Sequence, residues 1–253
     1  MKILMIGDIY GKQGMETLLK CLPEIKQTYK PQFIIANGEN LANGRGIKQA
    51  QYKKLMSAGI HALTMGNWVW GQSELKTFID DSNIVRPINY LNAPGHGYKL
   101  FNFNDKKILV INALGRTFMN GNLENPFLMI EKILDTVDAD VKIVDFHAEA
   151  TSEKIALGLY LDGKADLIVG THTHVQTADE RKLPNGTFYI TDVGMTGPFN
   201  GVIGVKADLV IDRFINGHSL PNEVAEGEMQ FNAVLVDLIN QSIKRIHLTS
   251  IFI

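Results

Sequence analysis

The chain has 253 residues, of which 45% are hydrophobic and 21% are charged, a composition typical of a globular protein. This length is near the upper end of what one α/β core organises, so we expect a single domain over residues 1–253. The net charge of -2 gives no electrostatic signal for binding nucleic acid or an anionic membrane surface.

Short apolar runs alternate with segments of helical periodicity through the first half of the chain. This alternation predicts βαβ units and a core of parallel strands, while the two extended runs near the C-terminus are expected to pair with a sheet. In chain order, the predicted elements are strand 2–7, helix 13–29, strand 33–37, helix 49–58, strand 62–65, a hairpin of strands 98–103 and 107–112, helix 126–137, strand 141–146, helix 152–160, and strands 167–170, 188–191, 233–238 and 243–251.

Three features of the sequence indicate a cytoplasmic protein with no membrane partner. Cys21 is the only cysteine, so an intramolecular disulfide cannot form. The first residues lack the longer apolar segment and the small-residue cleavage site of a secretory signal. No apolar stretch approaches the roughly 20 residues that span a bilayer.

Polar side chains follow five of the predicted strands, at the point where each strand ends. In an open parallel sheet, ligands bind in the crevice beyond these carboxyl ends, so side chains far apart in sequence should meet there. Glycines precede several of these side chains and would let the backbone turn sharply. The side chains are Asp8, Glu39, Asn40, Asn67, His147, His172 and His174.

Each of these residues also has an ordinary structural explanation. Asp8 could cap a helix, Asn67 could form an Asx turn, and His147 could be a hydrogen-bonded core histidine. The pair His172 and His174 is a stronger signal, because alternate residues of a strand face the same side. Packing does not require so many polar groups at strand ends, and burying them unpaired would be costly. The set as a whole therefore predicts a metal site.

The chemistry of the set favours two metal ions. Mixed imidazole, carboxylate and amide ligands suit manganese, iron or zinc. A carboxylate can bridge two cations, and Glu39 is the central candidate for that role. Two cations about 4 Å apart can bind a phosphate and activate a water nucleophile near neutral pH.

Several longer runs resemble the YmdB-like branch of the calcineurin-like metallophosphoesterases. The resemblance covers residues 1 to about 205 and is diffuse afterwards. It implies an α/β fold of the α/β/β/α sandwich type, a dinuclear centre and phosphodiesterase activity that includes 2′,3′-cyclic nucleotides. The matching runs are Gly7-Asp8, Asn37-Gly38-Glu39-Asn40, Met65-Gly66-Asn67, residues 145–154 (DFHAEATSEK), 170–178 (GTHTHVQTA) and 190–198 (ITDVGMTGP).

The resemblance also implies how the ligands divide between the two ions. Asp8, Asn40 and His174 would bind the first metal, Asn67, His147 and His172 the second, and Glu39 would bridge them. The wider superfamily has a histidine two residues after the first aspartate, where this chain and its branch have another residue, here Tyr10. The resulting ligand set fits iron or manganese and does not distinguish between these two metals. Zinc is an alternative.

This chain departs from the family pattern at position 68. The family motif reads Gly-Asn-His, and its histidine gives a proton to the leaving group, whereas this chain has Trp68 after Asn67. An indole is an N–H donor only and does not titrate near neutral pH. Trp68 could fill the pocket, or it could stack on a nucleobase.

The four other histidines are candidates to replace the missing proton donor. His61 begins the strand that Asn67 follows, and six strand residues separate the two by about 20 Å, which is too far. His96 lies in a glycine-rich loop that could fold toward the site. His218 and His247 look like surface or strand residues.

Two functions from different classes follow from these features. The first is a metal-dependent phosphodiesterase whose substrate is a small phosphodiester or cyclic nucleotide, re-tuned by Trp68. The alternative is a metal-binding regulatory or scaffold protein with little turnover, because the proton donor is missing. Both functions are compatible with a homo-oligomer. A metal-free nucleotide-binding protein is disfavoured, since the chain has neither a Walker loop nor a dinucleotide fingerprint.

Overall fold

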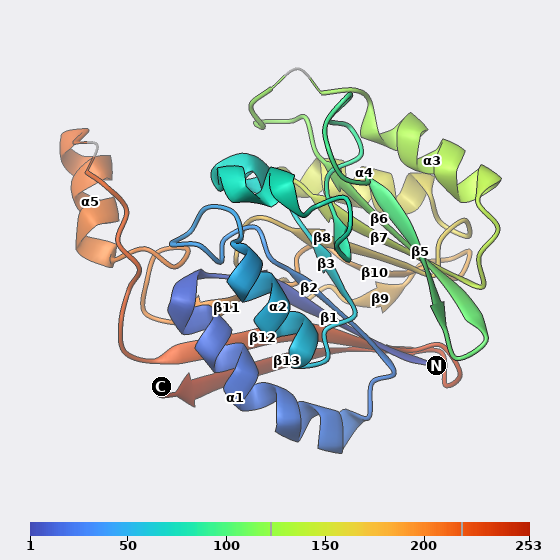
Figure 1. Cartoon of the computed structure of the whole chain (residues 1–253), viewed down its shortest axis with the longest axis horizontal. Coiled ribbons are helices and arrows are strands. Elements are labelled where there is room, and N and C mark those ends of the chain that lie inside the picture. The colour runs from blue at the N-terminus through green and yellow to red at the C-terminus, as the bar shows by residue number, and fades with distance from the viewer. Residues whose placement is uncertain (122, 219) are drawn as a thin grey trace.

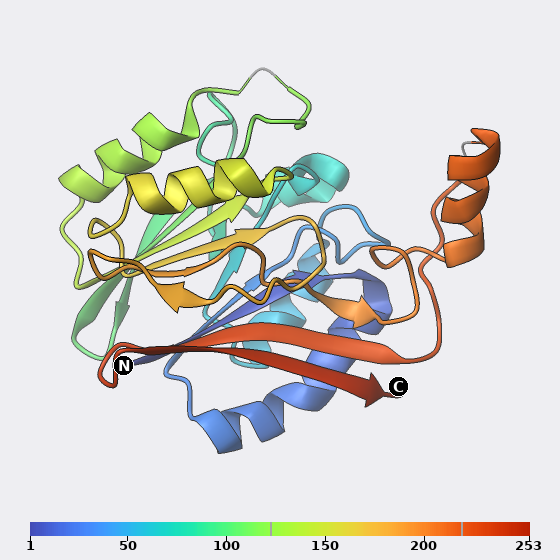
Figure 2. The same cartoon turned by 180° about the vertical axis from the view of Figure 1, so that it is seen from behind.

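The computed structural model describes residues 1–121, 123–218 and 220–253. Two β-sheets lie face to face, and helices cover their outer faces (Figure 1). Figure 2 shows the same layers from behind, with α1 (Gly11–Tyr29) below one sheet and α3 (Pro126–Thr136) above the other. This arrangement confirms the α/β/β/α sandwich expected from the sequence.

The first sheet has seven strands within the described part of the chain. The predicted C-terminal runs do pair with it, because β12 lies antiparallel to β1. In spatial order the strands are β13 (Ser242–Ile251), β12 (Met229–Asp237), β11 (Met195–Pro198), β1 (Lys2–Ile9), β2 (Phe33–Asn37), β3 (Ala62–Thr64) and β4 (Ile84–Val85).

The second sheet has six strands among the described residues. It contains the predicted hairpin, whose turn residues Asn104 and Asp105 adopt φ values of 46° and 61°. Such left-handed backbone is what a tight hairpin turn requires. In spatial order the strands are β5 (Tyr98–Phe103), β6 (Lys106–Leu114), β7 (Val141–His147), β8 (Leu167–Thr171), β10 (Phe188–Ile190) and β9 (Arg181–Lys182).

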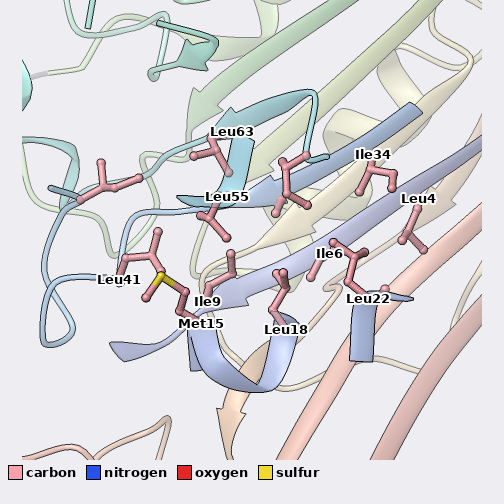
Figure 3. Packing of buried hydrophobic residues seen from close by; sticks show 14 of the residues in the cluster. Leu4, Ile6, Ile9, Met15, Leu18, Leu22, Ile34, Leu41, Leu55 and Leu63 are labelled. Atoms are coloured by element: carbon pink, nitrogen blue, oxygen red, sulfur yellow. The ribbon is translucent and has the colours of Figure 1, made fainter. Parts of the chain in front are cut away.

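Three hydrophobic layers hold the sandwich together, and β1 illustrates why. Its side chains alternate, so Leu4 and Ile6 face the helices whereas Ile3 and Met5 lie between the two sheets. Figure 3 shows the helix-facing layer, where residues of β1 pack near Leu18 and Leu22 of α1. The third layer packs the second sheet against α3 and α4 (Thr151–Tyr160).

Several short elements were not predicted from the sequence. These include α5 (Ala207–Asn216), which stands apart from the two sheets in Figures 1 and 2. The 3-10 helices η1 (Val69–Gly71) and η2 (Ser73–Thr77), which follow β3, were not predicted either, whereas α2 (Gln49–Ser57), which precedes β3, is the predicted helix 49–58. Among the described residues, no helix is long and apolar enough to cross a bilayer.

The parallel strands bring the predicted ligands to one edge of the sandwich. In the first sheet β1, β2 and β3 run parallel, and in the second β6, β7 and β8 do so. Their carboxyl ends meet at the same edge of each sheet, and the ligand distances described below join the two edges. The site therefore depends on the packing of one sheet on the other.

We expect substitutions between the sheets to lower the stability of the whole fold. Ile143, which is 1% exposed on β7, belongs to the layer between the sheets. Ile143→Ala should lower the free energy of unfolding by roughly 2–5 kcal/mol, and Ile143→Val by about 0.5–1.5 kcal/mol, because each leaves a cavity of different size. Chemical denaturation with matched metal content measures both. Ile239→Ala, at a side chain that is 79% exposed, is the control; an equal loss there would contradict the assignment.

Candidate metal centre

The strand ends bring the seven predicted ligands into one buried region. Asp8 lies in β1 and is paired in register with Asn37 at the end of β2, directly before the run that carries Glu39. His147 is the last residue of β7, and its register partner Thr171 ends β8. The remaining predicted ligands lie in the loops that follow β2, β3 and β8. They are Asn40, Asn67, His172 and His174.

One group of ligand atoms surrounds the Nε2 atom of His147. Glu39 Oε1 lies 3.0 Å away, His172 Nδ1 lies 3.0 Å away, and Asn67 Oδ1 lies 3.1 Å away. A single ring nitrogen offers one lone pair or one N–H, so it cannot satisfy three neighbours. Atoms of Glu39, His147 and His172 also lie within 4.8 Å of one another, a spacing that fits a metal ion.

A second group lies beside the first and contains His174, Asn40 and Asp8. His174 Nε2 is 3.2 Å from Asn40 Oδ1 and 4.0 Å from Asp8 Oδ1. Asp8 Oδ1 is buried and has no hydrogen-bond partner in the described part of the protein. A buried carboxylate oxygen without a partner is costly, and a cation would remove that cost.

Hydrogen bonds to the other ring nitrogen orient two of the imidazoles. His174 Nδ1 lies 2.8 Å from the carbonyl oxygen of Ile203, so this nitrogen carries the proton and Nε2 is left as an acceptor. His147 Nδ1 lies 2.9 Å from Thr171 Oγ1, which in turn donates to Asp145 Oδ1 at 2.7 Å. Backing of this kind is typical of metal-binding histidines.

Burial controls the charge of the site. Burial raises the pKa of Asp8 well above its usual range, with Glu39 adding to the shift, and raises the pKa of Glu39 to about 7. Burial lowers the pKa of all three imidazoles. It takes the pKa of His147 well below its usual range and that of His172 to about 4, and it also lowers the pKa of His174. The imidazoles are therefore neutral near pH 7, which is the form that binds metal.

Gly66 explains why the backbone can approach the two groups so closely. A β-carbon at this position would overlap Glu39 Oε2 and the imidazole of His147. Only glycine leaves that space for the ligand atoms and an ion between them. The donor types, the unpartnered carboxylate and this space all fit a metal centre.

The Thr-His-Thr-His run reaches the site by a route that the sequence did not predict. Its histidines lie beyond the end of β8 in a turn, with φ values of 103° for His172 and 66° for His174, so strand alternation does not explain their direction. The structure brings both imidazoles to the predicted ligands, but not by the strand alternation that was expected to direct them. They face different groups, because the left-handed turn separates them.

The side chain of Asp192 holds this turn in place. It accepts hydrogen bonds from the backbone N–H and the hydroxyl of Thr173, at 3.1 Å and 2.8 Å. Lys154 Nζ lies 2.7 Å from the same carboxylate, and both side chains are 1% exposed. Sequence reasoning assigned no role to Asp192 or Lys154, because a lysine in a helix gives no sign that it is buried.

Trp68 lies at the mouth of the site. Its backbone N–H donates to Glu39 Oε2 at 2.9 Å, and its ring, which is 36% exposed, lies 4.3 Å below the guanidinium of Arg45. Both residues line a cavity of about 410 Å³ that opens onto the ligands. The cavity is lined by Tyr10, Glu39, Asn40, Asn43, Gly44, Arg45, Trp68, His172, His174, Ile203, Val205, Pro221 and Asn222.

The remaining histidines lie away from this cavity. His96 is exposed and is not among the described residues that line it. His61 accepts a hydrogen bond from the backbone N–H of Ile34 and stacks on a phenylalanine near the start of β2. His218 is exposed and His247 lies in β13, as expected. None of these four histidines is among the described residues that line the cavity beside Trp68.

Comparisons with known proteins bear on the fold and the family. The sequence is 45% identical to a 2′,3′-cyclic-nucleotide 2′-phosphodiesterase of Bacillus subtilis, over 100% of this chain and 97% of that protein. It is 40% identical to a putative phosphatase/phosphodiesterase of Mycoplasma genitalium, over 95% of this chain and 89% of the relative.

Two solved structures are similar over nearly the whole chain. A hypothetical protein from Thermus thermophilus has a TM-score of 0.94 at 36% identity, covering 98% of this chain and 99% of that one. A novel phosphatase from Mycoplasma pneumoniae has a TM-score of 0.92 at 37% identity, covering 98% and 93%. Residues 4–251 match the family described as YmdB-like protein. The chain therefore belongs to the YmdB-like family of the calcineurin-like phosphoesterases.

Proposed function

We propose that this chain is a dinuclear metal-dependent phosphodiesterase that cleaves 2′,3′-cyclic nucleotides or related small phosphodiesters. The observation that carries the proposal is the pair of adjoining groups of ligand atoms, in which three neighbours crowd His147 Nε2 and Asp8 Oδ1 has no partner among the described residues. The name of the Bacillus subtilis relative supports the substrate class.

The two groups suggest how the ligands divide between two ions. Asp8, Asn40 and His174 would hold the first ion, and Asn67, His147 and His172 the second. Glu39 would bridge them. Its carboxylate contacts His147, and burial brings its pKa to about 7, so a neighbouring cation would keep it ionised.

The ligand types favour iron or manganese, and zinc remains an alternative. When bound, such a pair of ions supplies Lewis-acid activation of the phosphate ester and of a water nucleophile. The protein's own part is to position these ligands and to exclude bulk water from them. Asp8, Glu39 and Asn40, which are no more than 3% exposed, provide that exclusion.

The described lining of the cavity offers no free imidazole to protonate the leaving group. Among the described residues that line the cavity, the histidines are His172 and His174, both proposed ligands. Burial raises the pKa of Tyr10, so its phenol is a weak acid near neutral pH. We infer that the departing oxygen leaves without a proton from a side chain, which makes the reaction rate sensitive to the leaving group.

We predict that Glu39→Ala lowers metal occupancy at both positions, because the proposed bridge is lost. Mass spectrometric metal analysis of the purified protein measures the number of equivalents per chain. Glu16→Ala is the matched control, since the carboxylate of Glu16 is partly exposed on α1, contacts Lys12 and belongs to neither group of ligand atoms. Two full equivalents retained by the Glu39 variant would contradict the bridging role.

We predict that His147→Ala and His174→Ala each lose mainly one ion, and that the two ions differ. The reason is that the two imidazoles face separate groups of ligand atoms. Anomalous scattering from crystals of each variant locates the remaining ion. If both variants lost the same ion, the proposed division of ligands would be wrong.

A further prediction concerns the replacement of Trp68 by histidine. Trp68→His should raise kcat/KM for 2′,3′-cyclic nucleotides by about 10²–10⁴-fold, because a ribose alkoxide is a poor leaving group that benefits from a proton. It should change the hydrolysis of a nitrophenyl phosphodiester little, since nitrophenolate departs as an anion. Steady-state kinetics on both substrates, with metal content matched, provides the test.

The outcomes of that comparison separate three explanations. Equal gains on both substrates would mean that the indole acts by blocking the cavity. No gain on either substrate would favour the metal-binding regulatory protein over the enzyme. A wild-type rate on cyclic nucleotides equal to that of relatives with histidine at this position would refute the missing-acid argument.

A further inference from the structure

A second cavity adjoins the one above the metal ligands. It has a volume of about 460 Å³, and it shares Arg45, Pro221 and Asn222 with the first cavity. The two cavities therefore adjoin at Arg45, with the inner one beside the ligands and the outer one beside α5. The described lining of the outer cavity is Arg45, Arg213, Leu220, Pro221 and Asn222, so it contains two arginines and no acidic residue.

Arg45 is fixed at the junction of the two cavities. Its carbonyl oxygen accepts a hydrogen bond from Gln72 Nε2 at 3.0 Å, and its backbone N–H donates to the carbonyl of Ala42 at 3.1 Å. Its guanidinium lies 4.3 Å from the centre of the Trp68 ring, a cation–π contact that orients the positive charge. Within the described residues it has no carboxylate partner.

Arg213 faces the same cavity from the last turn of α5. One of its terminal nitrogens donates to Asn222 Oδ1 at 2.7 Å and to the carbonyl of Leu220 at 3.3 Å. No carboxylate lies within salt-bridge distance of it in the part of the chain that the structure describes. Its guanidinium group is thus held by neutral acceptors, and its positive charge is not compensated by a carboxylate among the described residues.

Two guanidinium groups without carboxylate partners around one cavity are suited to bind an anion of matching shape. Arginine offers parallel N–H donors that match the oxygens of a phosphate, and such charge-assisted bonds are the strong ones. We propose that the cleft between Arg45 and Arg213 is a subsite for a second phosphate group, carried by the same molecule whose phosphodiester lies at the metal ligands. This assignment rests on the proposed function for the identity of the reacting group.

The proposal names a substrate class and gives Trp68 a role. The preferred substrates are nucleotides that carry a further phosphate beyond the cyclic ester, such as 5′-phosphorylated cyclic nucleotides or the ends of short oligonucleotides. Trp68 acts as a support for Arg45 and not as a platform for a base, because the guanidinium already covers the indole ring. The substitution at position 68 then exchanges a proton donor for a support of a phosphate-binding arginine.

The test is an equilibrium binding measurement that does not depend on turnover. Isothermal titration calorimetry compares adenosine 3′-phosphate with adenosine 3′,5′-bisphosphate on the metal-loaded protein. The second compound should bind at least about tenfold more tightly, as expected for added charge-assisted hydrogen bonds. Arg213→Gln and Arg45→Gln should each remove most of this preference. Arg181→Gln is the matched control, because Arg181 lies on β9 over Tyr189 and should keep the preference.

Each outcome either supports or overturns the proposal. Equal affinity for the two nucleotides in the wild-type protein would overturn it, as would a preference that survives both arginine substitutions. Equal affinity together with binding of inorganic phosphate that requires Arg213 would overturn it in favour of a free phosphate. Hydrolysis of 2′,3′-cyclic adenosine phosphate is measured separately, so absence of turnover with the preference intact would refute the proposed function and leave the subsite in place.

Discussion

The constraint on which the site depends is the burial of negative charge at the strand ends. Asp8 and Glu39 are almost fully buried and have no lysine or arginine partner among the described residues. The buried cation nearby, Lys154, is committed to Asp192 and through it to the histidine turn. Unpaired carboxylates are costly in such surroundings. A bound metal would offset that cost, and the neutral imidazoles that burial produces are in the form that binds metal.

The same constraint explains why two sheets are needed. The two buried carboxylates follow strands of the first sheet and the three imidazoles follow strands of the second, so neither sheet could bring these groups together alone. Gly66 lets the backbone after β3 pass close to Glu39 and His147, where any side chain would collide with both.

Positive charge is distributed differently from negative charge in this molecule. Positively charged side chains lie at the mouth of the cavity beside the ligands, where the guanidinium of Arg45 packs on Trp68 and Arg213 lines the outer cavity. An anionic substrate would meet these arginines on its way to the ligands, and its far end would remain beside them. In such an arrangement, binding energy from a remote phosphate can compensate for a leaving group that receives no proton.

The sequence by itself determined most of the order of strands and helices and the set of polar residues at strand ends, because alternating burial and strand-end polarity are local patterns. The sandwich class followed from the resemblance of its longer runs to a known family and not from those patterns. The resemblance already implied that His172 and His174 face different groups, and only the tertiary structure decided what directs them there, namely a left-handed turn and not strand alternation. The tertiary structure also decided that Lys154 is buried and that Arg45 covers Trp68. Such contacts join residues far apart in the chain, and no local pattern encodes them.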